Sequence, residues 1–176
     1  MLLKTIATVT FCLFIFVQIS IAAPQNDACS IPLDLQRDVD TKYPGATLVS
    51  LSDLDEDDRA FFQADHGDAC PGLVRVDFYG DGKPTLALVL VKKSGSKKKS
   101  ELVLAHLVEE HWQTMVLDIA DEIPVVWSLP PGKYQDVYNE KTIRAPKPVI
   151  VLGRYESWAI LYAWTGKRAI KIWIAD

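Results

Sequence analysis

Histidine, cysteine and methionine are scarce in this chain, and their scarcity excludes several kinds of site. The 176 residues include three histidines, three cysteines and two methionines. His106 and His111 lie five positions apart around a predicted turn, whereas two zinc ligands on one helical face need a spacing of four. No Gly-x-Ser-x-Gly segment provides the nucleophile turn of an α/β-hydrolase. These absences favour a non-catalytic binding protein, with an unrecognised hydrolase as an alternative.

Positive charge is not in excess either. The chain has 19 lysines and arginines against 23 aspartates and glutamates, so its formal net charge is −4. A protein with a net negative charge is not attracted electrostatically to nucleic acid, which is a polyanion. We therefore expect no nucleic-acid partner.

The longest apolar run lies near the N-terminus. It extends from Ile6 to Val17, follows Lys4, and ends in the small residues Ser20 and Ala22. This pattern predicts a cleavable secretory signal over residues 1–22, and Pro24 would break any helix that continued. An uncleaved membrane anchor is the alternative, since the run is close to the roughly 20 residues that a spanning helix needs. Cleavage predicts a secreted or periplasmic protein without a membrane span.

Two cysteines would remain after cleavage. Cys12 lies within the predicted signal, which leaves Cys29 and Cys70. An even pair in an oxidising compartment predicts a Cys29–Cys70 disulfide that ties the N-terminal arm to the start of the first long strand. Residues 23–176 have the length of one globular domain.

The pattern of apolar residues predicts an α+β fold. A short helix is expected over Pro32–Tyr43, a short strand over Ala46–Ser50, and a second helix from Ser52–Asp53, with Leu54, Phe61 and Phe62 facing the core. From Leu73 onward, β-branched and aromatic runs alternate with turn residues. They predict seven strands: Leu73–Tyr79, Thr85–Lys92, Glu101–Val108, Trp112–Ile119, Pro148–Gly153, Trp158–Trp164 and Ala169–Ala175. The two helices are expected to pack on one curved, mostly antiparallel meander sheet of about seven strands.

One long segment does not fit this strand rhythm. Pro130–Lys147 is rich in proline, glycine, tyrosine and charge. It is either a functional loop or a structured crossover to the other edge of the sheet. Its aromatic residues, Tyr134 and Tyr138, are candidate partner-binding residues.

A lysine cluster provides a second candidate partner surface. Lys92 and Lys93 precede a Ser-Gly-Ser segment, and Lys97, Lys98 and Lys99 follow it. We expect a solvent-exposed loop between two strands, in which lysine protects a hairpin tip or attracts an anionic surface. The expected partner is a protein or an anionic envelope polymer.

One local motif resembles a known family. The segment Asp77–Ala87, with the sequence DFYGDGKPTLA, is similar to the calcium-binding loop of FG-GAP and VCBS repeats in extracellular β-propellers. The resemblance implies Asp77 and Asp81 as ligands of a weak Ca²⁺ site, and hence a calcium-dependent adhesion or stability module as an alternative function. Tyr79 and Thr85 stand where that family places further ligands, and no second copy of the motif occurs. The alternative interpretation is a hairpin turn that needs glycines with positive φ.

Overall fold

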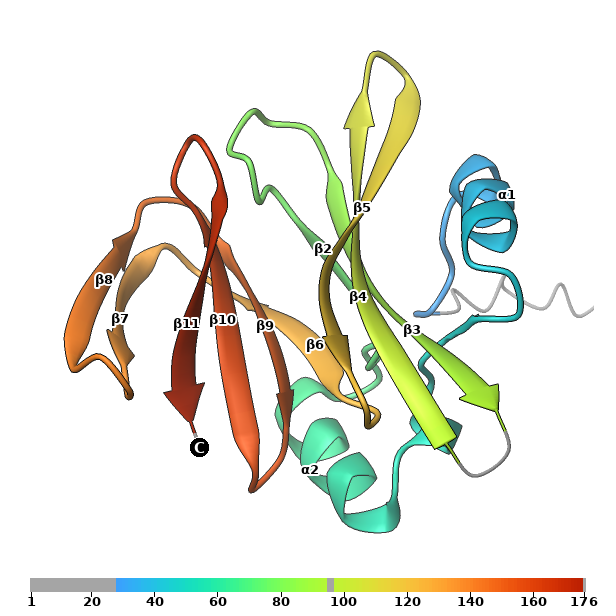
Figure 1. Ribbon diagram of the computed structural model, residues 1–176, viewed down its shortest axis with the longest axis horizontal. Coiled ribbons are helices and arrows are strands. Elements are labelled where there is room, and N and C mark those ends of the chain that lie inside the picture. The colour runs from blue at the N-terminus through green and yellow to red at the C-terminus, as the bar shows by residue number, and fades with distance from the viewer. Residues whose placement is uncertain (1–27, 95–96, 176) are drawn as a thin grey trace, which may run out of the picture.

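The computed structural model describes residues 28–94 and 97–175 (Figure 1). The predicted signal, residues 1–22, lies outside the described residues. The elements in chain order are α1 (Leu33–Lys42), β1 (Thr47–Leu48), a 3-10 turn (Leu51–Asp53), α2 (Glu56–His66), β2 (Leu73–Val76), β3 (Thr85–Ser94), β4 (Lys97–Val108), β5 (His111–Ala120), β6 (Val125–Leu129), β7 (Gly132–Asp136), β8 (Lys141–Ala145), β9 (Val149–Arg154), β10 (Trp158–Trp164) and β11 (Ala169–Ala175).

The strands form three antiparallel sheets. In sheet A the order is β1-β3-β4-β5, and β2 also pairs with β3; in sheet B it is β11-β10-β9-β6; sheet C is the hairpin of β7 and β8. The α+β class and the antiparallel pairing are confirmed. The prediction of about seven strands on one curved sheet is wrong, because the described residues contain eleven strands in three sheets.

The sequence pattern missed β6, β7 and β8. β6 begins directly after Pro124 and carries the chain from sheet A to sheet B, so one meander becomes two sheets. β7 and β8 are polar five-residue strands within Pro130–Lys147. This segment is therefore a hairpin between β6 and β9, which pair with each other, and it does not cross to the opposite edge of sheet B.

The main core lies between sheets A and B. Val89 and Leu102 face it from sheet A, and Ile150 and Leu152 face it from sheet B. The opposite face of sheet A packs on α1, where Leu88 is buried. Because the middle of β3 is buried on both faces, Leu86–Val91 form a continuous apolar run with no polar alternation.

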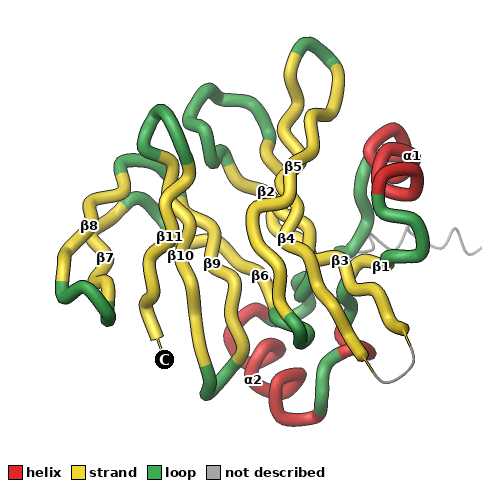
Figure 2. The backbone as a smooth tube through the Cα atoms, in the orientation of Figure 1, coloured by secondary structure: helices red, strands yellow, loops and turns green. Residues whose placement is uncertain are grey.

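The two helices cover different parts of the molecule. Leu35 and Val39 of α1 pack on the outer face of sheet A, whereas Phe62 of α2 enters the core between the sheets. Figure 2 shows α2 beneath the lower ends of both sheets and α1 beside β3. The predicted packing of both helices on a single sheet is thus wrong.

The helix boundaries follow the local capping chemistry. α1 lies within the predicted range, and its last residue is followed by Tyr43 and Pro44. The second helix begins at Glu56 and not at Ser52, because Ser50 and Asp53 form a capping box around the 3-10 turn. Asp55 then caps α2 by accepting the Asp58 N–H at 2.9 Å.

The core prediction for the second helix holds in part. Leu54 and Phe62 are buried, as expected. Phe61 is 40% exposed and stacks on Tyr155 at a ring distance of 5.7 Å, so its predicted core position is wrong. Among the described residues, no helix combines the length and apolar character needed to span a bilayer.

The predicted disulfide is present. Cys29 and Cys70 are bonded across a sequence separation of 41, and Cys70 lies just before β2. The bridge holds the segment ahead of α1 at the entrance to sheet A, as the sequence predicts.

Removing this bridge is expected to lower the free energy of unfolding. The double variant Cys29→Ser/Cys70→Ser no longer closes a loop of 41 residues in the unfolded chain. In the chain-entropy model this lowers the free energy of unfolding by about 4 kcal/mol. Urea unfolding of the variant and of the oxidised protein measures the difference. Equal unfolding midpoints would contradict this account of the bridge.

Candidate functional site

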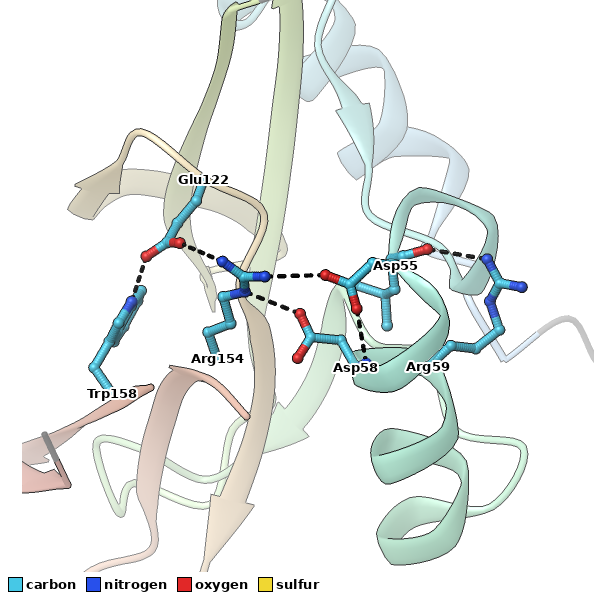
Figure 3. Close-up of polar contacts among 7 residues, drawn as sticks. Asp55, Asp58, Arg59, Glu122, Arg154 and Trp158 are labelled. Carbon is cyan, nitrogen blue, oxygen red and sulfur yellow. Dashed lines mark hydrogen bonds and ion pairs between the residues drawn. The ribbon is translucent and has the colours of Figure 1, made fainter. Parts of the chain in front are cut away.

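Arg154 is the centre of a polar network that contains Asp55, Asp58, Glu122 and Trp158 (Figure 3). It lies at the end of β9 and donates to Asp58 at 3.1 Å, to Asp55 at 3.0 Å and to Glu122 at 3.2 Å. Glu122 also accepts a hydrogen bond from the Trp158 indole. One guanidinium therefore connects the start of α2, the β5–β6 connection and the hairpin of β9 and β10.

The electrostatics of this network follow from burial. Burial raises the pKa of Asp58, which the Arg154 hydrogen bond partly offsets. The pKa of Asp55 is lowered, chiefly by the Asp58 N–H and also by Arg154. Arg154 itself stays fully protonated because hydrogen bonds from its guanidinium to Asp58 and Glu122 raise its pKa. The network is consequently a fixed structural contact between charged groups.

An acidic cleft opens beside the network. Its volume is about 580 Å³, and it is lined by Asp53, Leu54, Asp55, Asp58, Lys98, Asp121, Glu122, Ile123 and Arg154. Five of the nine lining residues carry carboxylates and two carry cations, so we call it the acidic cleft.

A second cavity lies next to it on the α1 side of sheet A. It has a volume of about 540 Å³ and is lined by Lys42, Tyr43, Pro44, Ala46, Leu90, Lys92, Lys98, Lys99, Glu101 and Asp121. Four lysines outnumber two carboxylates, and the rest of the lining is mostly apolar. We call it the lysine groove. Lys98 and Asp121 line both cavities, so the two are neighbours.

The strand register brings the lysines together. Lys92 on β3 lies directly opposite Lys99 on β4, and Lys42 reaches the groove from the end of α1. Like charges directly opposite each other on an antiparallel pair are destabilising. Within the described part of the chain, no carboxylate forms an ion pair with Lys92, Lys98 or Lys99. Lys42, by contrast, is paired with Asp38 at 3.3 Å, and the carboxylates Glu101 and Asp121 also line the groove.

The ionisable residues of the two cavities are carboxylates, lysines, one arginine and one tyrosine among the described lining residues. No histidine, cysteine or serine occurs among the described lining residues of either cavity. Ammonium groups around an apolar floor attract and hold an anion by charge and hydrogen bonding. The four lysines of the groove are groups of this kind, and Glu101 and Asp121 line it beside them.

The predicted partner-binding lysines lie at the ends of two paired strands, and their role in binding stays a prediction. Lys98 and Lys99 line the groove, while the side chain of Lys97 lies outside the described part of the chain. β3 extends to Ser94 and β4 begins at Lys97, so the lysines lie on strands and the predicted long loop is wrong.

The two predicted tyrosines are not brought to the groove. Tyr134 is half-buried on β7 and donates its hydroxyl to the Pro130 carbonyl. Tyr138 is exposed, and its ring meets the Trp173 ring edge to face at 5.4 Å. Both belong to the hairpin of β7 and β8, at the opposite end of the molecule from α1 (Figure 2). A single partner-binding surface does not contain both predicted sets.

The predicted calcium residues lie in the turn between β2 and β3. Asp77 accepts the Gly82 N–H at 3.2 Å, and Gly80 and Gly82 have φ angles of 70° and 76°, as a tight turn requires. The second oxygen of Asp77 is buried without a hydrogen-bond partner among the described residues. The Lys147 ammonium donates to the Gly80 carbonyl at 3.3 Å, so one cation already lies at this turn.

Asp81 contacts His106 and does not bond to the Asp77 oxygen that lacks a partner. His106 lies 3.1 Å from Asp81 through one ring nitrogen and 3.1 Å from the Thr85 hydroxyl through the other. The pKa of Asp81 is lowered, first by the Lys83 N–H and also by His106. His111 is an exposed residue at the start of β5. Within residues 28–94 and 97–175, no three histidine, cysteine or acidic side chains form a metal-binding group.

Sequence reasoning missed Arg154, Glu122 and Lys42. Arg154 and Glu122 are far apart in sequence from Asp58, and only the tertiary fold brings the three side chains together. Lys42 lies in the last turn of α1, where a positive charge interacts favourably with the helix dipole. The sequence therefore explains this lysine without a binding role. The pairing of Lys92 with Lys99 follows from the register in which Ser94 lies opposite Lys97, whereas a hairpin centred on Gly95 would pair Lys92 with Lys98.

Comparison with known proteins found no match among protein families, curated proteins or solved structures.

Replacement of Arg154 is expected to destabilise the fold most at neutral pH. In Arg154→Met, Asp58 loses the group that offsets its burial, and we expect a loss of about 2 kcal/mol at pH 7. The folded-state pKa of Asp58 is raised, so its ionisation lowers the free energy of unfolding as pH rises through that pKa. The stability lost in Arg154→Met is therefore expected to become smaller toward pH 4, as Asp58 becomes protonated. Urea unfolding at pH 4, 5.5 and 7 measures this dependence.

Two further variants identify the cause. Adding Asp58→Asn to Arg154→Met is expected to recover part of the stability at pH 7, because no buried charge remains. Arg144→Met, on exposed β8, is the matched control and is expected to be close to wild type. An Arg154→Met loss that is the same at pH 4 and pH 7 would contradict the role assigned to Asp58.

Proposed function

We propose that this protein is a secreted or periplasmic, non-catalytic binding module, and that its lysine groove holds an anionic partner. The observation that carries the proposal is the Lys92–Lys99 pair: the two lysines lie directly opposite each other on neighbouring strands, form no ion pair with a described carboxylate, and line one cavity with Lys42. Bound anions would relieve the repulsion between these side chains. Binding would therefore stabilise both the complex and the hairpin.

The surrounding residues support a partner that is anionic and partly apolar. Leu90, Ala46 and Tyr43 provide apolar surface within the groove, which a fully hydrated anion would leave unused. The acidic cleft next to the groove repels anions, so it restricts where an anionic partner lies. The disulfide supports an oxidising compartment.

Dextran sulfate is a suitable first probe, with neutral dextran as the negative control. Isothermal titration at 50 mM salt is expected to show binding of dextran sulfate, and the association constant is expected to fall as salt rises. The double variant Lys92→Gln/Lys99→Gln is expected to bind dextran sulfate about tenfold more weakly, since each exposed ion pair contributes up to about 1 kcal/mol.

The double variant Lys83→Gln/Lys167→Gln is the matched control, because it also removes two positive charges, but from exposed turns outside the groove. It is expected to retain nearly full affinity. Equal losses in the two double variants would show that net charge alone attracts the probe, and would overturn the proposed role of the groove.

A calcium-dependent adhesion or stability module is the second candidate function. The buried Asp77 oxygen without a partner favours it, because a cation would satisfy that atom. The Lys147 ammonium at Gly80 weighs against it, since a second cation would be repelled. For this reason it ranks below the lysine groove.

Calcium binding by this turn has a direct test. If Ca²⁺ binds only the folded state, a concentration of one hundred times its dissociation constant stabilises by about 2.7 kcal/mol relative to EDTA. The increase in melting temperature is expected to be lost in Asp77→Asn and retained in Asp121→Asn, an exposed aspartate at the two cavities. An unchanged melting temperature across the calcium titration would remove this candidate.

A further inference from the structure

A third cavity lies between the end of β5 and sheet B. Its volume is about 240 Å³, and it is lined by Asp118–Ala120 of β5 and by residues of β9, β10 and β11, among them Trp158, Lys171 and Trp173. It shares no described lining residue with the acidic cleft or the lysine groove. We call it the tryptophan cavity.

The charged groups of this cavity neutralise each other. Asp118 and Lys171 are the charged residues of its described lining, and their side chains are 2.8 Å apart. Burial raises the pKa of Asp118, but hydrogen bonds, first from Lys171 and then from Tyr162, outweigh this effect and lower the pKa. Asp118 is therefore ionised at neutral pH, and the pair has no net charge. Asp118 would repel an anion and Lys171 would repel a cation, so the cavity favours a neutral ligand.

The same pair retains hydrogen-bonding capacity for a ligand. A carboxylate has about four lone-pair positions, and an ammonium group has three N–H donors. One oxygen of Asp118 accepts from Tyr162 and Lys171, and the other accepts the Ile119 N–H at 2.9 Å, so three positions are used. Lys171 uses one donor on Asp118. The pair can thus accept one further hydrogen bond and donate another, which suits a hydroxyl group.

Two tryptophans provide aromatic surface in the cavity. The Trp158 and Trp173 rings lie 6.4 Å apart, with an angle of 64° between their planes. The Trp158 indole donates to Glu122, and the Lys171 ammonium lies 5.3 Å from the centre of the Trp173 ring. These contacts hold both rings in place before a ligand arrives, which lowers the entropy lost on binding.

The surface beside the cavity is apolar as well. Ile119, which lines the cavity, is exposed. Tyr138 and Val137 are also exposed; the first meets the Trp173 ring at 5.4 Å, and the N–H of the second donates to the Trp173 carbonyl. Three of the seven exposed large apolar residues of the described chain thus occur here. Exposed apolar residues that occur together mark a binding surface, whereas single ones need no explanation.

We infer that the tryptophan cavity binds one ring of a neutral saccharide whose ring substituents are all equatorial. Such a ring has axial C–H groups on its faces and hydroxyl groups around its edge. Its apolar face packs on the two indoles, and a hydroxyl accepts from Lys171 and donates to Asp118. The cavity is smaller than the roughly 300–1,000 Å³ of sites for drug-sized ligands, so the other rings of an oligosaccharide lie outside it, beside Tyr138.

An apolar ligand fits these groups less well. It would remove water from Asp118 and Lys171 without replacing the lost hydrogen bonds, which is costly. Because the tryptophan cavity and the lysine groove have no described lining residue in common, saccharide binding goes beyond the proposed anion binding and does not depend on it.

NMR of the five tryptophans tests this site. The probes are cellotetraose and chitotetraose, whose rings are all equatorial, titrated in large excess into isotopically labelled protein. The indole N–H signals of Trp158 and Trp173 are expected to shift until they saturate. Those of Trp112, Trp127 and Trp164, which are not among the described lining residues, are expected to stay in place.

Variants with matched controls identify the groups that bind. Trp173→Leu is expected to bind cellotetraose about tenfold more weakly, whereas Trp164→Leu, which removes another half-buried indole of sheet B outside the cavity, is expected to stay close to wild type. Lys171→Met is expected to weaken binding about tenfold, and Lys167→Met, in the exposed turn before β11, is expected to leave it unchanged. The remaining indole signals show that each variant is folded.

Neutral dextran distinguishes the shape of the sugar ring. Its α-linkage places an axial oxygen on each ring, so dextran is expected to leave the Trp158 and Trp173 signals in place, as its use as a control for the lysine groove requires. A dextran shift equal to that of cellotetraose would overturn the preference for equatorial rings.

The outcomes separate this inference from the proposed function. Cellotetraose binding is expected to be unchanged by salt and by Lys92→Gln/Lys99→Gln, since a neutral ligand releases no counterions. If neither oligosaccharide shifts the Trp158 and Trp173 signals, or if Trp173→Leu and Trp164→Leu lose the same affinity, saccharide binding is wrong and the anion-binding function stands. If the two signals shift with protein concentration alone, a second copy covers the cavity and the inference is overturned.

Discussion

The contact between Arg154 and three carboxylates is the constraint on which the arrangement of the two sheets depends. Sheets A and B share no strand pairing, so packing and a few polar contacts must fix their positions. Arg154 provides such a contact at one end, because Asp58 comes from α2 and Glu122 from the connection between the sheets. Nearer the middle, Asp118 of β5 accepts from Tyr162 of β10 and from Lys171 of β11. These contacts are directional, whereas the apolar core between the sheets is not.

The two cavities lie on different sides of sheet A: the acidic cleft is lined by the start of α2 and the connection between β5 and β6, whereas the lysine groove is lined by the end of α1 and by β3 and β4. α2 begins with acidic residues, as a helix N-terminus favours, and those residues become one wall of the acidic cleft. The hairpin of β3 and β4 extends past the core, and its ends carry lysines because apolar residues there would be exposed. Opposite charges on neighbouring cavities thus follow from ordinary rules for helix ends and strand ends.

Local features were predictable from the sequence, and long-range ones were not. The bounds of α1, the disulfide and the positions of β3, β9 and β10 follow from residue patterns that act over a few positions. The division into two sheets depends on β6, a five-residue strand after Pro124 whose sequence alone resembles the other short apolar runs. Two polar strands, β7 and β8, have no apolar alternation to reveal them.

The candidate site shows the same limit. Lys98 and Lys99 were identified as surface lysines, but their joining with Lys42 required the packing of α1 on sheet A. Nothing local in the sequence connects Arg154 with Asp58, which is 96 residues away. Tyr134 and Tyr138 attracted attention as aromatic residues in a polar segment, yet the fold uses the first to bond Pro130 and packs the second against Trp173.

The adjacency of the two cavities gives the molecule an orientation in an external field. Separated positive and negative surfaces, which meet at Lys98 and Asp121, form an electric dipole. Near a negatively charged surface this dipole turns the molecule so that the lysine groove faces the surface and the acidic cleft faces away from it. The torque acts within about 8 Å at physiological ionic strength, where screening is incomplete. Encounters at that range would then begin more often with the lysine groove than with the acidic cleft, although the chain as a whole is negatively charged.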